Sequence, residues 1–125
     1  MNKKILDTLK LYEKNSYSPY SKYKVVAMLF CKSGDVYMGV NVENASYSLT
    51  MCAERGALFS AVANHETAFE KIIIYARGKN LPHPCGACLQ ALSEFVKKDF
   101  IVTVTNGVRE ESHKFGEYLP KRFVL

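Results

Sequence analysis

Two stretches decide the fold that this sequence predicts: Cys52-Ala53-Glu54 and Pro84-Cys85-Gly86-Ala87-Cys88. Each lies at the start of a segment with apolar residues at helical spacing, 52–63 and 86–96. The N-terminus of a helix stabilises negative charge and favours a thiolate over a thiol. The sequence therefore predicts three thiolates carried by the N-termini of two helices.

These three cysteines match the number and type of ligands in a catalytic zinc site. Such a site has three protein ligands and keeps a fourth position open for water. Cys85 and Cys88 are three residues apart, so one helical turn places both on one face. Glu54 follows Cys52 by two residues and can face the open position, where a carboxylate shuttles protons between water and substrate. A C-x-E stretch followed by P-C-x-x-C is the signature of zinc deaminases, here with Cys in place of His as the first ligand.

A structural zinc site or a redox pair is the alternative interpretation of the C-x-x-C stretch. A structural zinc site has four protein ligands, and either Cys31 or His83 could supply the fourth. Cys31 lies in an apolar run and is expected to be a core residue. His83 lies between two prolines and is expected in a loop, while His65 and His113 are expected at the surface.

Length and composition predict one cytoplasmic domain. The 125 residues fit a single domain, 1–125, and a domain of this size often gains stability from oligomerisation. The net charge is +5, but the basic residues are scattered, so no nucleic-acid partner is expected. We find no signal-peptide pattern and no run near the ~18 apolar residues of a membrane span, and expect no membrane partner. In the reducing cytoplasm, the four cysteines should form no disulfide framework.

The rest of the chain alternates between helical and extended patterns. Turn-forming residues over 15–21 and a hairpin turn at Ser33-Gly34-Asp35 separate the first elements. The expected helices are 2–14, Cys52–Ala63 and 86–96, and the expected strands are Val25–Cys31, Val36–Val40, Ile72–Ala76, Phe100–Thr105 and, last, Val108–Phe115. This alternation predicts an α/β layered sheet.

Over nearly its whole length the chain resembles the small homotetrameric zinc-dependent cytidine deaminases. Ser18-Pro19-Tyr20-Ser21-Lys22-Tyr23 resembles the loop at the family's site entrance. Asn41-Val42-Glu43-Asn44-Ala45-Ser46-Tyr47 resembles its ribose-binding segment, and Arg55 and Gln90 extend the match of the two zinc segments. The resemblance implies a three-layer α-β-α cytidine deaminase-like fold with a mixed five-stranded sheet. It also implies a homotetramer whose active sites borrow residues from neighbouring subunits.

The resemblance implies a role for each matched residue. Cys52, Cys85 and Cys88 would bind Zn²⁺, and Glu54 would be the proton shuttle.

For the substrate, Asn41 and Glu43 would hold the ribose 3′-hydroxyl, which agrees with the acceptor atoms of these side chains. Tyr23 would lie against the pyrimidine ring, since an aromatic face suits a flat base. Three more residues are expected to contact the substrate, the last two across subunit interfaces: Ala53, Tyr47 and Phe123.

Three positions depart from the family pattern. Val26 stands where Gly is usual, and Gly56 where Thr is common. Leu89 replaces an Arg that normally follows the second zinc-segment cysteine. Three thiolates exceed the charge of Zn²⁺ by one, so Arg55 would have to offset that charge largely alone.

The implied activity is hydrolytic deamination of cytidine and deoxycytidine to uridine and deoxyuridine, a step of pyrimidine salvage. The alternatives are a deaminase of another cytosine compound, such as blasticidin S or a nucleic acid, and a non-catalytic zinc module. Glu43 in its Asn-Val-Glu-Asn setting favours a free nucleoside, and the short chain disfavours a polynucleotide channel. Glu54 disfavours the non-catalytic module, because a structural site has no use for a carboxylate there.

Overall fold

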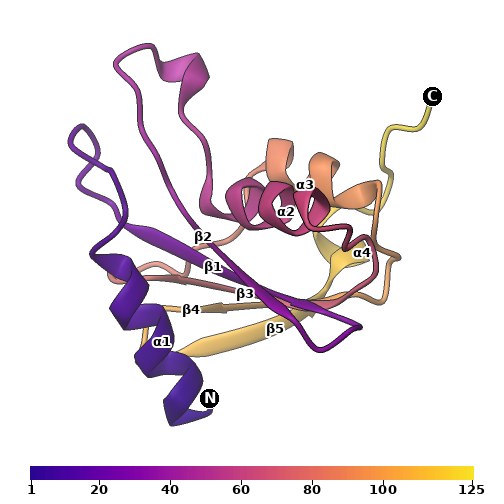
Figure 1. The fold of residues 1–125 in the computed structure, drawn as a ribbon, viewed down its shortest axis with the longest axis horizontal. Helices are drawn as coiled ribbons and strands as arrows, with labels where there is room; N and C mark the ends of the chain where they lie inside the picture. The colour runs from indigo at the N-terminus through magenta and orange to yellow at the C-terminus, as the bar shows by residue number, and fades with distance from the viewer.

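The computed structural model describes all residues 1–125 and contains one mixed five-stranded sheet between helices (Figure 1). The strands are β1 (Val25–Cys31), β2 (Val36–Val40), β3 (Phe69–Ala76), β4 (Ile101–Thr105) and β5 (Glu110–Lys114). The helices are α1 (Lys3–Glu13), α2 (Ala53–Ala63), α3 (Gly86–Ser93) and α4 (Phe115–Tyr118), with a 3₁₀ turn η1 at Tyr47–Leu49. The α/β fold with a mixed sheet is confirmed.

The sheet has the strand order β2-β1-β3-β4-β5. Only β3 and β4 are parallel, and the other neighbours are antiparallel. The predicted hairpin has the expected bounds, whereas β3 begins at Phe69, earlier than the expected Ile72. The last strand lies within the expected 108–115.

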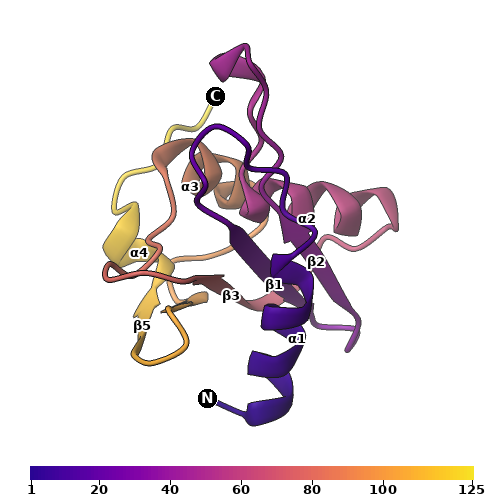
Figure 2. The same cartoon turned by 90° about the vertical axis from the view of Figure 1, so that its left-hand side faces the viewer.

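Helix α1 covers one face of the sheet (Figure 2). Asn2 begins it, because its side-chain oxygen accepts the backbone N–H of Lys4 at 2.7 Å. Leu9 is fully buried and belongs to a small core with residues of β1 and β3: Val26, Met28, Ile73 and Tyr75. This helix closes the sheet on the side away from the cysteines.

Helices α2 and α3 cover the opposite face, over the larger core, which completes the three layers (Figure 1). Helix α2 lies directly on the backbone of β2 at Gly39. A Cβ at Gly39 would lie 2.1 Å from the carbonyl oxygen of Ala53 and 2.5 Å from the backbone nitrogen of Ala57. Only a glycine fits this approach, and it fixes the N-terminal turn of α2, which follows Cys52.

Helix α4 was not predicted, because four residues give no periodic pattern. It directly follows β5, and its Phe115 is buried in the larger core. The hydroxyl of Tyr118 is 2.7 Å from Nδ1 of His83, which ties α4 to the loop before Cys85. None of the helices has the length and apolar character that crossing a membrane requires.

The contact at Gly39 gives a first prediction. Gly39→Ala should lower the free energy of unfolding by about 1–3 kcal/mol or more, since backbone atoms of α2 must move to admit the methyl group. The shift should also reduce the zinc content, because α2 begins next to Cys52. Denaturant unfolding and elemental analysis measure both effects.

Gly56→Ala is the matched control. It adds the same methyl group to the facing helix, where the nearest atom is 3.7 Å away, so it should be neutral or stabilising. Equal effects of the two substitutions would contradict the close-approach argument.

Candidate active site

Three cysteine sulfurs meet where α2 and α3 begin. Cys52 and Cys85 are the residues immediately before the first turns of α2 and α3, as the sequence predicts, and Cys88 lies in the first turn of α3. The Sγ atoms of Cys52 and Cys85 are 3.7 Å apart, and those of Cys85 and Cys88 are 3.3 Å apart. All three lie within 4.8 Å of one another.

This cluster fits zinc. A tetrahedral zinc with Zn–S bonds of about 2.3 Å separates its sulfurs by roughly 3.8 Å, within the observed range. No other Cys, His, Asp or Glu joins the group, so it has the three ligands of a catalytic site. Cys31 is buried in the larger core and His83 pairs with Tyr118, so neither is a fourth ligand.

The thiols also need a cation to ionise together. Hydrogen bonds from the Cys88 thiol and the Arg55 guanidinium lower the pKa of Cys52 to about 5. The pKa of Cys88 is raised, because its proton is held by Cys52 and its side chain is buried. One thiolate thus disfavours ionisation of the neighbouring thiol. A divalent metal ion would offset this repulsion, because its charge stabilises several thiolates together.

Arg55 is the cation beside the cluster. Its Nη2 donates to Sγ of Cys52 at 3.4 Å, and this bond raises the pKa of the guanidinium. Its Nε is buried without a hydrogen-bond partner. Leu89 is buried in the larger core and carries no charge, so Arg55 is the cation in contact with the sulfurs.

Glu54 lies in the first turn of α2 and is only 5% exposed. It nonetheless lines the pocket described below. Burial, with a smaller contribution from the neighbouring Cys52, raises the pKa of its carboxyl to about 7. A carboxyl with this pKa both takes and gives up protons near neutral pH.

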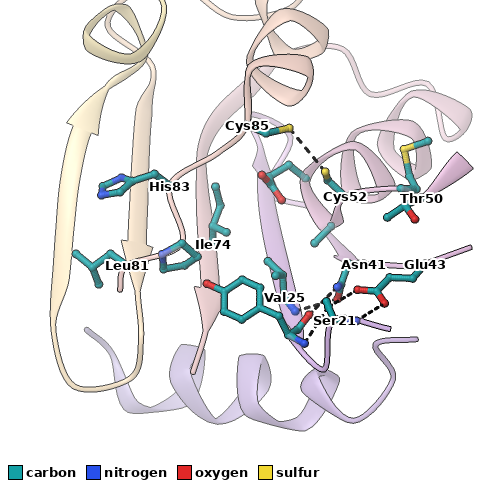
Figure 3. A pocket seen from close by; sticks show the side chains of 15 residues that line it. Ser21, Val25, Asn41, Glu43, Thr50, Cys52, Ile74, Leu81, His83 and Cys85 are labelled. Carbon is teal, nitrogen blue, oxygen red and sulfur yellow. Dashed lines mark hydrogen bonds between the residues drawn. The ribbon is translucent and has the colours of Figure 1, made fainter. Parts of the chain in front are cut away.

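A cavity of about 410 Å³ opens in front of the cluster. Figure 3 shows Cys52 and Cys85 at one end and Ser21, Asn41 and Glu43 at the other. Seven of the predicted site residues line it: Tyr23, Asn41, Glu43, Cys52, Ala53, Glu54 and Cys85. The volume lies in the usual range for small-molecule pockets.

Asn41 and Glu43 hold the loop at the far end of the cavity. Glu43 accepts the backbone N–H groups of Tyr20 and Ser21, each at 3.0 Å, and the hydroxyl of Ser21. These bonds, the Ser21 hydroxyl foremost, lower the pKa of Glu43. Asn41 donates from Nδ2 to the carbonyl of Tyr23 at 2.8 Å. A carboxylate offers about four acceptor positions, so one remains on Glu43 for a ligand, and Asn41 keeps one N–H.

Two of the predicted substrate-contacting residues do not line this cavity. Tyr47 lines an adjoining hollow of about 340 Å³ that shares Ser21, Glu43 and Thr50 with the first. Phe123 lines neither hollow.

Sequence reasoning missed several lining residues, among them Thr50 and the Leu81-Pro82-His83 stretch. The only sequence signal for that stretch is that it directly precedes the second zinc segment.

Comparison with known proteins agrees with this site. Residues 1–104 match the family model described as the cytidine and deoxycytidylate deaminase zinc-binding region. The chain is 39% identical to the cytidine deaminase of Sporosarcina psychrophila over 103 residues, which are 82% of this chain and 76% of that protein. For the cytidine deaminase of Mycoplasma genitalium the identity is 37% over 121 residues, covering 95% and 92%. The crystal structure of cytidine deaminase from Burkholderia pseudomallei superposes with a TM-score of 0.89 at 38% identity, covering 98% of this chain and 100% of that one.

The fold and the thiol cluster define a zinc-dependent enzyme of the hydrolase class. The family model covers most of the chain, and relatives match nearly all of it. The chain belongs to the family of cytidine and deoxycytidylate deaminases.

The cluster predicts which cysteines retain zinc. Cys85→Ala should reduce the zinc content from about one equivalent per chain to near zero, because two thiols are too few for a catalytic site. Cys31→Ala removes a thiol from the core and should leave the zinc content unchanged. Elemental analysis after dialysis measures both, and zinc loss from the Cys31 variant would contradict the three-ligand assignment.

Arg55 gives a separate prediction. Arg55→Ala should lower zinc retention or turnover by about 10- to 100-fold, the usual effect of losing a hydrogen bond to a metal ligand. Arg109→Ala, which removes an exposed arginine in the β4–β5 turn, is the control and should change neither quantity. Intact zinc retention and turnover in Arg55→Ala would refute charge compensation by this residue.

Proposed function

We propose that this protein catalyses the zinc-dependent hydrolytic deamination of cytidine and deoxycytidine to uridine and deoxyuridine. The observation that carries the proposal is the buried Glu54 carboxylate, which lines the cavity beside the three-thiol cluster. Cytidine deaminase relatives over most of the chain support it. We further propose that residues 1–125 act as one domain, since a single sheet runs through them.

In the proposed mechanism the metal would activate water, and Glu54 transfers the protons. Cys52, Cys85 and Cys88 would hold Zn²⁺, which when bound would act as a Lewis acid and lower the pKa of water towards neutral pH. Glu54 accepts the proton of the attacking water and passes it to ring nitrogen N3 as the oxygen adds to C4. Glu54 then carries the remaining hydroxyl proton to the amine. The C4–N bond breaks, ammonia leaves, and a carbonyl remains at C4.

The other end of the cavity is suited to the sugar. We assign the free acceptor position of Glu43 and the free N–H of Asn41 to the ribose 3′-hydroxyl, since a hydroxyl both donates and accepts. Tyr23 and Ala53 line the same cavity, and we assign the Tyr23 ring to the face of the base and Ala53 to the wall beside it. The two polar ends of one cavity therefore match the two polar ends of a nucleoside.

We also propose a cytoplasmic homotetramer. Tyr47 and Phe123 are 80% and 70% exposed, which supports the assignment of both to a neighbouring copy's active site. Other large apolar side chains are exposed on α2, on the arm 42–51 and at the C-terminus: Leu49, Phe59, Val62, Val124 and Leu125. The arm and the C-terminus both extend on the α2–α3 side of the sheet (Figure 1). Four free thiols and no disulfide favour a reducing compartment.

The test of the activity is the ultraviolet spectrum of cytidine, which changes as the amine is lost. The zinc-loaded protein should convert cytidine and deoxycytidine, and should use free cytosine poorly because cytosine lacks the sugar. Turnover of cytosine at the rate of cytidine would refute ribose recognition. Turnover of blasticidin S alone would refute the nucleoside assignment.

Glu54→Gln tests the mechanism. The amide cannot shuttle protons, so turnover should fall by at least about 10²–10⁴-fold while the zinc is retained. Glu70→Gln makes the same change on the exposed side of β3 and should leave turnover unchanged. A zinc-loaded Glu54→Gln protein with near wild-type turnover would disprove the assigned role.

A further inference from the structure

The C-terminal segment is bound to α3 through its backbone. Nε2 of Gln90 donates to the carbonyl oxygen of Phe123 at 3.1 Å, and the backbone N–H of Phe123 donates to Oε1 of Gln90 at 3.3 Å. The Gln90 side-chain amide thus pairs its N–H and its C=O with the backbone C=O and N–H of Phe123. A residue of an adjacent β-strand can pair with a backbone in the same way. The position of the Phe123 backbone is therefore fixed relative to α3.

Arg122 provides a second attachment one residue earlier. Its Nη1 donates to the carbonyl of Ser93 and, at 3.5 Å, to that of Val96. Ser93 is the last residue of α3, and the last carbonyls of a helix have no partner within it, while Val96 lies three residues farther along the chain. A guanidinium at this end also interacts favourably with the helix dipole. The segment is thus held near the middle and at the end of α3.

The backbone of Phe123 is held, but its ring is not covered. The residue remains 70% exposed, and Val124 and Leu125 after it are also exposed. Two polar attachments that leave an aromatic ring in solvent bury little apolar surface. Their effect is to fix the main chain that carries the ring, which removes part of the ordering cost from any later contact of the ring.

We propose that Gln90 is a positioning residue that orients Phe123 for contact with the substrate pocket of a neighbouring copy. This inference rests on the proposed function, which assigns Phe123 to that pocket. Gln90 lies two residues after Cys88 on α3, so one helix carries a zinc ligand of its own site and the attachment for the ring. The position of the ring is therefore tied to the helix that builds the active site.

Gln90→Leu tests the inference, because leucine nearly keeps the volume and removes both hydrogen bonds. The backbone amide of Phe123 should exchange with solvent faster, as measured by hydrogen exchange of the C-terminal peptide. The KM for cytidine should rise about 2- to 10-fold, as expected from the cost of ordering one side chain, with a smaller change in kcat. Zinc content should stay unchanged. Glu94→Gln, an exposed change at the end of the same helix, should alter none of these quantities.

A double mutant separates the inference from the proposed function. If Gln90 acts through Phe123, Phe123→Ala should raise the KM, and adding Gln90→Leu should raise it no further. A Phe123→Ala protein with an unchanged KM would overturn the assignment of Phe123 in the proposed function. If Phe123→Ala raises the KM but Gln90→Leu does not, or the two effects multiply, the role of Gln90 is wrong. Zinc loss from Gln90→Leu would equally overturn it, since it would indicate damage to α3.

Discussion

The backbone contact between Gly39 and the first turns of α2 is the constraint on which the site depends. With the carbonyl of Ala53 and the nitrogen of Ala57 both within 2.5 Å of where a Cβ would stand, the helix has no lateral freedom on β2. Cys52 and Glu54 flank Ala53, so the thiol and the carboxylate are placed by the same contact. Buried alanines rather than larger residues along α2 keep this approach close.

Helix α3 serves as the counterpart of α2. Its first turn brings Cys85 and Cys88 to Cys52, and its far end holds the C-terminal segment through Arg122. The loop before it is held by the contact between His83 and Tyr118 of α4. The cysteine end of the site is therefore built by helix N-termini, while Asn41 and Glu43 fasten the loop at the other end of the cavity.

The parts of this molecule that follow from short-range patterns could be predicted from the sequence. The β1–β2 hairpin, the two cysteine-bearing helices and the pairing of Cys85 with Cys88 depend on spacing within a few residues. Cys52 lies 33 residues before Cys85, and its place in the cluster was predicted from the paired C-x-E and P-C-x-x-C motifs. Other contacts between distant residues could not be predicted, such as Gln90 with Phe123, His83 with Tyr118, or the three bonds that engage Glu43. Each of these contacts joins segments that come together only in the folded sheet. No pattern within a few residues of sequence predicts such a contact. In the sequence, Leu89 stands out because it replaces the usual Arg. In the structure it is a residue of the larger core.

The position of the cysteines along the chain makes the metal site a cross-link as well as a reaction centre. Cys52 and Cys85 are 33 residues apart, and the segment between them includes all of β3. A bond across a loop of this length removes denatured-state entropy worth roughly 3–4 kcal/mol, by analogy with a disulfide. That is a large share of the total stability of a small domain. A metal bound by Cys52 and Cys85 would therefore link the two ends of the segment that contains β3, the central strand of the sheet.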